Sequence, residues 1–173
     1  MKRIWIVGQT GAGKTTLAQT LAERLSLSHT ELDALHWQAD WTPLTPAAFR
    51  ARVEQVLGAD AWIVDGNYSA VSDLVAARAD TLVWLDYNLA TIFKQLSVRT
   101  LRRVFLREAL WNGNRETFRG QFLSRESLFV WALKTRRKYK RRYGALVGDP
   151  RQSHKVVHLR SPQEMRWWLE HLS

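Results

Sequence analysis

One short motif near the N-terminus restricts the fold of this chain more than any other feature. Residues 8–15 read GQTGAGKT, which matches the phosphate-binding pattern GxxxxGK[ST]. Residues 3–7 before it are suited to a buried strand, and residues 14–25 have the pattern of a helix. A strand, a glycine-rich loop and a helix in this order form the context that the motif requires. We therefore predict an α/β fold that binds a nucleoside triphosphate.

The chemistry of such a loop gives its residues distinct roles. Glycines let successive backbone N–H groups turn toward phosphate oxygens, and the helix N-terminus adds a positive dipole. Lys14 is expected to reach the β- and γ-phosphates, and the Thr15 hydroxyl to bind magnesium. The predicted cofactors are ATP and Mg²⁺. The loop residues expected to contact them are Gly8, Thr10, Gly11, Ala12, Gly13, Lys14, Thr15 and Thr16.

Short apolar runs and helical patterns alternate along the chain. Strands are expected at residues 3–7, 30–33, 62–65, 81–86 and 155–159, and helices at residues 14–25, 46–57, 69–78, 88–110, 124–143 and 162–172. This alternation predicts a parallel sheet with helices on both faces and a ligand site at the carboxyl ends of its strands. With 173 residues and no linker-like segment, the chain is expected to form a single domain.

Three aspartates close predicted strands and are candidates for the site. Asp65 is expected to hold a magnesium-bound water beside Thr15 or to accept the proton of an acceptor hydroxyl, and the alternative is a turn cap. Asp33 is expected to orient or deprotonate the acceptor, and the alternative is a helix cap. Asp86 precedes a long helix, and capping that helix is as good an interpretation as catalysis.

Tryptophan is abundant, and its positions divide into two groups. Trp5, Trp62 and Trp84 lie within predicted strands and are expected in the core. Trp37 and Trp41 follow Asp33 in a predicted loop, where they either line an acceptor pocket or pack under the loop.

Positive charge is concentrated in one segment. Residues 94–142 hold fifteen Lys or Arg and three acids, a net charge of +12, whereas the whole chain has +10. Residues 89, 92, 96, 99, 103 and 107 form one helical row that begins apolar and ends with three arginines. We predict that Arg99 binds the nucleotide and that Arg103 and Arg107 take part in catalysis, in a lid over the phosphates. The alternative is a surface that grips nucleic acid.

Composition indicates the redox compartment of the protein and its relation to membranes. The chain has no cysteine, which excludes a disulfide scaffold and fits a reducing compartment. No apolar run approaches the ~20 residues of a membrane span. We expect a cytoplasmic protein without a membrane segment, and the sequence indicates no oligomeric state.

Several of these segments together resemble a known family, the P-loop kinase-like DNA-topology-modulation proteins of the FlaR type, which are related to adenylate kinase. The likeness spans nearly the whole chain and rests on residues 8–16, 32–37, 62–68, 79–86, 111–116 and 159–162. It implies a nucleoside monophosphate kinase fold with a five-stranded sheet, an acceptor-binding section at about residues 34–60 and a basic helical lid at about residues 99–142. It also implies an adenine pocket near residues 160–162, which makes Arg160 a candidate nucleotide contact.

One segment departs from true adenylate kinases, which follow the Asp-Gly pair with a phenylalanine, a proline and an arginine. Here Asn67 and Tyr68 follow it, and no arginine occurs in the next nine residues. The predicted function is therefore transfer of the ATP γ-phosphoryl group to a small-molecule acceptor, either a nucleotide or a small hydroxylated metabolite such as those of shikimate- and gluconate-type kinases. The alternative is an ATP-dependent nucleic-acid-binding regulator, and the direction of the arginine row separates the two hypotheses.

Overall fold

The computed structural model describes residues 1–105, 112, 128–147 and 156–172. Within these residues the chain forms a five-stranded parallel sheet in the order β2-β3-β1-β4-β5. The strands are β1 (Arg3–Gly8), β2 (His29–Glu31), β3 (Trp62–Asp65), β4 (Thr81–Leu85) and β5 (Val156–Leu159). The predicted parallel sheet is confirmed.

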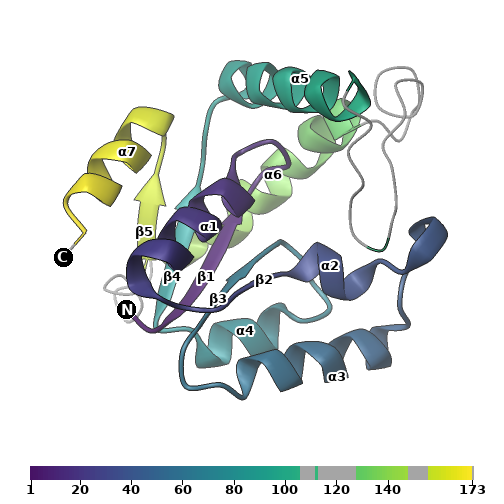
Figure 1. Ribbon diagram of the computed structural model, residues 1–173. Coiled ribbons are helices and arrows are strands. Elements are labelled where there is room, and N and C mark those ends of the chain that lie inside the picture. Colours follow the sequence, from purple (N-terminus) through teal and green to yellow (C-terminus); the bar gives the residue numbers. More distant parts are fainter. Residues whose placement is uncertain (106–111, 113–127, 148–155, 173) are drawn as a thin grey trace.

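Helices cover both faces of this sheet (Figure 1). Buried side chains from α1 (Lys14–Leu25), α5 (Leu89–Phe105) and α7 (Pro162–Glu170) pack on one face. Those from α3 (Pro46–Leu57), α4 (Ser72–Arg78) and α6 (Leu128–Val147) pack on the other, although Ala132 of α6 joins the first group. A short helix α2 (Leu32–His36) and a single 3₁₀ turn η1 (Ala39–Trp41) connect β2 to α3.

The core has two layers because side chains alternate along each strand. In β1, Ile4 and Ile6 pack toward α1, whereas Trp5 and Val7 pack toward α3 and α4. Trp5, Trp62 and Trp84 are all buried, so the expectation that these tryptophans belong to the core is confirmed. The central strands β1, β3 and β4 are buried on both faces, as strands of parallel sheets usually are, and the edge strands β2 and β5 are partly exposed.

The second strand is shorter than predicted, and this moves Asp33 from a strand end into a helix. The last residue pair between β2 and β3 is Glu31 with Asp65. The backbone then turns away at Gly66, which has a φ of +137° and on which a Cβ would lie 2.8 Å from the Leu32 Cβ. β3 therefore offers no partner beyond Glu31, and the chain enters α2 with Leu32 buried.

Asp86 does not cap the helix that follows it. The cap of α5 is Asn88, whose Oδ1 accepts a hydrogen bond of 2.8 Å from the Thr91 N–H. Asp86 instead lies 3.3 Å from Nε2 of His158 and 3.8 Å from Nζ of Lys140. In the described part of the chain, no helix combines the length and apolar character needed to cross a bilayer.

Candidate active site

A cavity of about 1840 Å³ opens beside the carboxyl ends of the central strands. The phosphate-binding loop lines it with residues 10–16, and the segments after β2 and β3 line it with residues between 31 and 41 and residues 66–69. Side chains from α5, α6 and the first turns of α7 complete the wall. Most of the loop residues predicted from the sequence therefore lie at one cavity, together with Asp33. Asp65 is not part of the wall itself but is bonded to Thr15, which is.

Gly8 has a different place from the rest of the loop. It has a φ of +151°, and a Cβ at this position would lie 2.7 Å from the Leu85 carbonyl oxygen of β4. Gly8 is thus where β1 packs against its neighbour before the loop begins, and it does not line the cavity. The loop then turns through a hydrogen bond of 3.1 Å from the Ala12 N–H to the Gln9 carbonyl, and α1 starts at Lys14.

Lys14 lies at the centre of the charged groups in the cavity. Its Nζ donates a hydrogen bond of 3.1 Å to the Gln9 carbonyl oxygen. Burial lowers the pKa of Lys14, the carboxylates of Asp65 and Asp33 oppose this shift, and Arg99 adds to it. Lys14 is therefore within electrostatic reach of both predicted carboxylates and of the first lid arginine.

Asp65 is held by two side chains from different elements. Its Oδ2 accepts a hydrogen bond of 2.8 Å from the Thr15 hydroxyl, and its Oδ1 lies 3.4 Å from Nε2 of His29. Only 4% of Asp65 is exposed. Carboxylate and hydroxyl oxygens are the hard ligands that Mg²⁺ prefers, so this pair fits the cation that the loop motif implies.

Asp33 lies in α2 and faces Tyr68 from the segment after β3. The Tyr68 hydroxyl donates a hydrogen bond to Asp33 Oδ1. Burial, with the nearby Asp33 charge, raises the pKa of Tyr68, so the hydroxyl keeps its proton and serves as a donor. Both residues line the cavity, and so do Trp37 and Trp41. Of the two alternatives for these tryptophans, their place on the cavity wall agrees with the pocket.

An aromatic cluster surrounds this pair. The His36 ring lies 4.7 to 4.9 Å from the rings of Trp37, Phe49 and Tyr68. Trp37 and Trp41 meet edge to face with centroids 5.8 Å apart. Burial lowers the pKa of His36, although Asp33 opposes this shift, so the ring is neutral at pH 7. The Nδ2 of Asn112 donates a hydrogen bond of 2.5 Å to the Trp37 carbonyl.

Arg99 continues the row of α5 toward the phosphate-binding loop, as the sequence predicts. Ile92 and Leu96 of this row are buried, and α5 passes so close to Gly11 that a Cβ there would lie 3.2 Å from the Leu96 Cβ. Arg99 lines the cavity one step further along. Arg103 belongs to α5, but its side chain lies outside the described part of the structure, as does Arg107.

Arg160 lies on the surface, outside the cavity wall. Its backbone N–H donates a hydrogen bond of 2.8 Å to Glu164 Oε2 at the start of α7. The wall at this end is formed by Tyr87, Pro162 and Met165. The apolar residues of α7, rather than Arg160, therefore border the space where the resemblance implies an adenine pocket.

Sequence reasoning missed the polar contacts that join α6 to the loop. Asn67 Nδ2 donates to the Gly8 carbonyl, while its Oδ1 accepts from the Gly8 N–H at 3.2 Å and from the Tyr143 hydroxyl at 3.2 Å. Gln9 Nε2 donates to the Ala132 carbonyl at 2.9 Å. The only sequence signal was the amide of Asn67 directly after the Asp-Gly pair.

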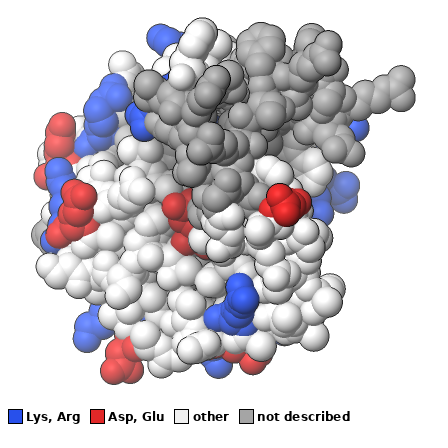
Figure 2. Space-filling model, turned by 45° about the vertical axis from the view of Figure 1, so that its right-hand side comes forward, with Lys and Arg blue, Asp and Glu red and all other residues white. Residues whose placement is uncertain are grey.

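The basic residues of α6 point in several directions. Arg142 donates a hydrogen bond to the Ser72 hydroxyl at the start of α4, and Arg136 donates one of 3.4 Å to the Tyr87 carbonyl. Lys138 lines the cavity. Three residues, which we call the basic stripe, are exposed at helical spacing: Lys134, Arg137 and Arg141. On the face drawn in Figure 2, the described Lys and Arg side chains are scattered rather than gathered into one patch.

Three solved structures show the same fold. A shikimate kinase from Bacteroides thetaiotaomicron superposes with a TM-score of 0.59 at 14% identity and covers 98% of this chain and 94% of that chain. A gluconokinase from Sinorhizobium meliloti has a TM-score of 0.57 at 18% identity and covers 98% and 87%. A shikimate kinase from Acinetobacter baumannii in complex with shikimate has a TM-score of 0.56 at 15% identity and covers 98% and 90%.

These likenesses establish the predicted fold, that of P-loop kinases of the nucleoside monophosphate kinase type. A family model described as ethanolamine utilisation and propanediol utilisation matches residues 1–52, which contain the phosphate-binding loop. No curated protein has a matching sequence.

Proposed function

We propose that this protein is an ATP-dependent kinase that phosphorylates a hydroxyl group of a small molecule. The observation that carries the proposal is the convergence of three groups on one cavity: Lys14 of the loop, Thr15 with Asp65 bonded behind it, and the Asp33–Tyr68 pair. Phosphoryl transfer needs charge neutralisation, a metal site and a group that positions the acceptor hydroxyl. The three groups correspond to these three needs.

Each group has a role in the proposed reaction. Lys14 and Arg99 neutralise charge on the phosphates, and Thr15 with Asp65 would hold Mg²⁺, which neutralises the β- and γ-phosphate oxygens when bound. The acceptor oxygen forms a bond to the γ-phosphorus as the bond to the β–γ bridging oxygen breaks, and ADP leaves with that electron pair. Asp33, oriented by Tyr68, accepts the hydroxyl proton and releases it to water.

The division of the chain follows from these roles. We assign residues 1–173 to a single domain, with acceptor binding in the section around residues 34–60 and a basic lid around residues 99–142. Placement of Asp33, Trp37 and Trp41 at the cavity supports the acceptor section. Placement of Arg99 supports the lid. The likeness in motifs to FlaR-type proteins, which are related to adenylate kinase, agrees with this division.

The basic stripe favours a second candidate function. Lys134, Arg137 and Arg141 are exposed and spaced to meet phosphates along one side of α6, which suits contact with nucleic acid. In that case ATP turnover would switch a DNA-binding state, as expected of a topology modulator. We favour the kinase because Arg99, the described arginine of the α5 row, lines the cavity that holds Lys14.

The substitution Asp65→Asn tests the proposal. We expect acceptor-dependent ADP release to fall about 100-fold or more while the affinity for ATP changes far less, because the carboxylate acts in the reacting complex. Asp86→Asn is the matched control, since Asp86 follows the neighbouring strand β4 and contacts His158 and Lys140 rather than Thr15. Wild-type turnover in Asp65→Asn would show that Asp65 has only a structural role, and the proposal would lose its support.

A further inference from the structure

Acidic and basic charge on the cavity wall come from different segments of the chain. Five described cationic residues line it, and they come from the loop, α5 and α6: Lys14, Lys94, Arg99, Arg102 and Lys138. Within residues 31–69, all of which the structure describes, the charged lining residues are two carboxylates, Glu31 and Asp33. Residues 31–69, the acceptor part of the wall, therefore contribute only acidic charge, whereas the basic charge of the wall comes from the loop, α5 and α6.

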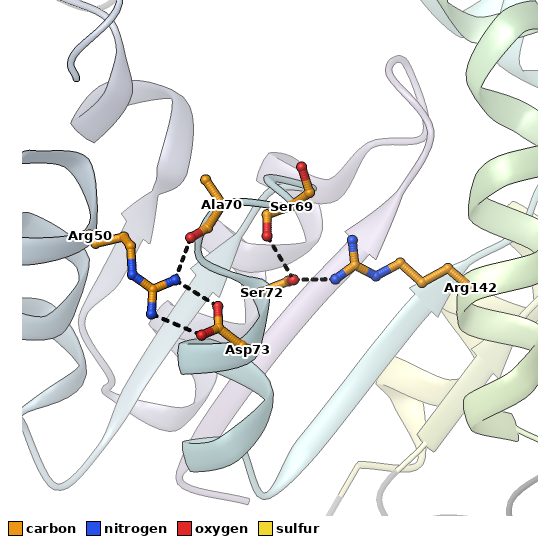
Figure 3. Close-up of polar contacts among 6 residues, drawn as sticks. All are labelled: Arg50, Ser69, Ala70, Ser72, Asp73 and Arg142. Carbon is orange, nitrogen blue, oxygen red and sulfur yellow. Dashed lines mark hydrogen bonds and ion pairs between the residues drawn. The ribbon is translucent and has the colours of Figure 1, made fainter. Parts of the chain in front are cut away.

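The two arginines of the acceptor section are directed away from this wall. Arg50 forms two hydrogen bonds of 2.8 Å with the carboxylate of Asp73 and one of 2.6 Å with the Ala70 carbonyl (Figure 3). Arg52 is exposed, and its guanidinium group donates a hydrogen bond of 3.5 Å to the Leu35 carbonyl oxygen. Residues 34–60 contain no other Lys or Arg. The acceptor section thus places its cations outside the cavity and its rings inside.

The aromatic rings of the cavity wall limit the kind of ligand that this wall can bind. Trp37, Trp41, Tyr68 and His36 all line the cavity, and Trp37 and Trp41 stand at 80° to each other like two walls of a corner. Aromatic faces attract flat rings by stacking and cations by the charge distribution of the π-system. Carboxylates beside such faces favour a cation and disfavour an anion.

We propose that the acceptor is an alcohol without anionic groups, which presents a flat ring or an ammonium group to Trp37 and Trp41 and its hydroxyl to Asp33. This inference rests on the proposed function and narrows it. An acceptor phosphate or carboxylate in this part would face Glu31 and Asp33 and would have to give up its hydration without a cation from residues 31–69. Nucleosides and amino sugars fit this description, whereas nucleotides and sugar acids do not.

Matched compounds that differ in charge test the inference. The panel contains adenosine with adenosine 5′-monophosphate, and glucosamine and glucose with gluconate. Binding is followed by tryptophan fluorescence in the presence of Mg²⁺ and a saturating non-hydrolysable ATP analogue, which occupies the nucleotide site, and turnover is followed by ADP release with ATP. We expect at least one neutral or cationic member to bind about 10-fold or more tightly than its anionic partner, the effect of one unfavourable charge contact.

Two variants connect the preference to the wall. Glu31→Gln should reduce the discrimination between glucosamine and gluconate, because it removes one of the two carboxylates. Glu23→Gln on the exposed surface of α1 is the matched control and should leave the ratio unchanged. Trp37→Ala should weaken binding of the preferred compound and reduce its fluorescence change.

The outcomes separate the inference from the proposed function. Preferential binding of neutral or cationic compounds without phosphoryl transfer would uphold the charge preference of this wall and refute the kinase. Faster phosphorylation of an anionic member would uphold the kinase and overturn the inference. Equal binding of charged and uncharged partners, or binding of no member of the panel, would also overturn it.

Discussion

The surroundings of Lys14 favour its interaction with a phosphate group. Its pKa is lowered by burial, and its ammonium group donates its hydrogen bond to a carbonyl of the loop itself. We expect Lys14→Ala to keep the fold and to weaken ATP binding about 10-fold or more, the loss of a charged hydrogen bond. Calorimetric titration with ATP and far-UV circular dichroism check the two parts. Lys2→Ala, at an exposed position, is the control, and unchanged ATP affinity in Lys14→Ala would argue against the loop assignment.

His36 makes the stability of the acceptor section depend on pH. The pKa of His36 is lower in the folded protein than the ordinary value of 6.5. As the pH falls through 6.5, the unfolded chain therefore binds a proton at His36 before the folded protein does. Its contribution therefore makes stability fall as pH decreases through 6.5. His36→Phe keeps a ring among its neighbours and should lose less stability between pH 7 and pH 5 than the wild type in urea unfolding. An identical pH dependence in the two proteins would contradict this account, and His171→Phe, at an exposed histidine, is the control.

Asn67 joins three elements: the end of β1, the segment after β3 and the C-terminal part of α6. Its amide satisfies both backbone groups of Gly8 and accepts from Tyr143. Asn67→Ala leaves these groups without their partner, and we expect a loss of about 1–3 kcal/mol in the free energy of unfolding. Urea unfolding measures the loss, with exposed Gln163→Ala in α7 as the control. A loss equal to that of the control would show that Asn67 does not hold these elements together.

The sequence predicted elements best where a local pattern decides them. The spans of α1, α3 and β3 agree with the expectation because apolar spacing and end residues lie within each segment. The end of β2 was predicted too late because it depends on where its distant partner β3 turns at Gly66. The residues of the candidate site also divide into those that local motifs predict and those that depend on distant contacts. Lys14, Thr15 and Asp65 belong to local motifs, whereas the contacts of Asn67 and Tyr68 depend on which elements the fold brings together.

At the scale of the whole molecule, the excess positive charge lies on two different surfaces. Arg99 faces the cavity, and the basic stripe faces solvent. We expect Arg99→Ala to lower acceptor-dependent turnover at least about 10-fold, since it removes a charge near the phosphates. The triple variant with alanine at positions 134, 137 and 141 should keep that turnover and is the matched control. DNA titrations at several salt concentrations complete the test. Normal turnover in Arg99→Ala, together with a shallower salt dependence of DNA binding, would favour the nucleic-acid regulator instead.

The central claim is that this cavity transfers the γ-phosphoryl group of ATP to an alcohol, and the destination of that group tests it most directly. The protein is incubated with Mg²⁺, ATP labelled in the γ-phosphoryl group and the panel of neutral, cationic and anionic alcohols, and the labelled products are separated. We predict label in an organic phosphate monoester, in amounts equal to the ADP formed, and its loss in Lys14→Ala. Label that appears in inorganic phosphate alone, at the same rate with and without every alcohol, would contradict the account.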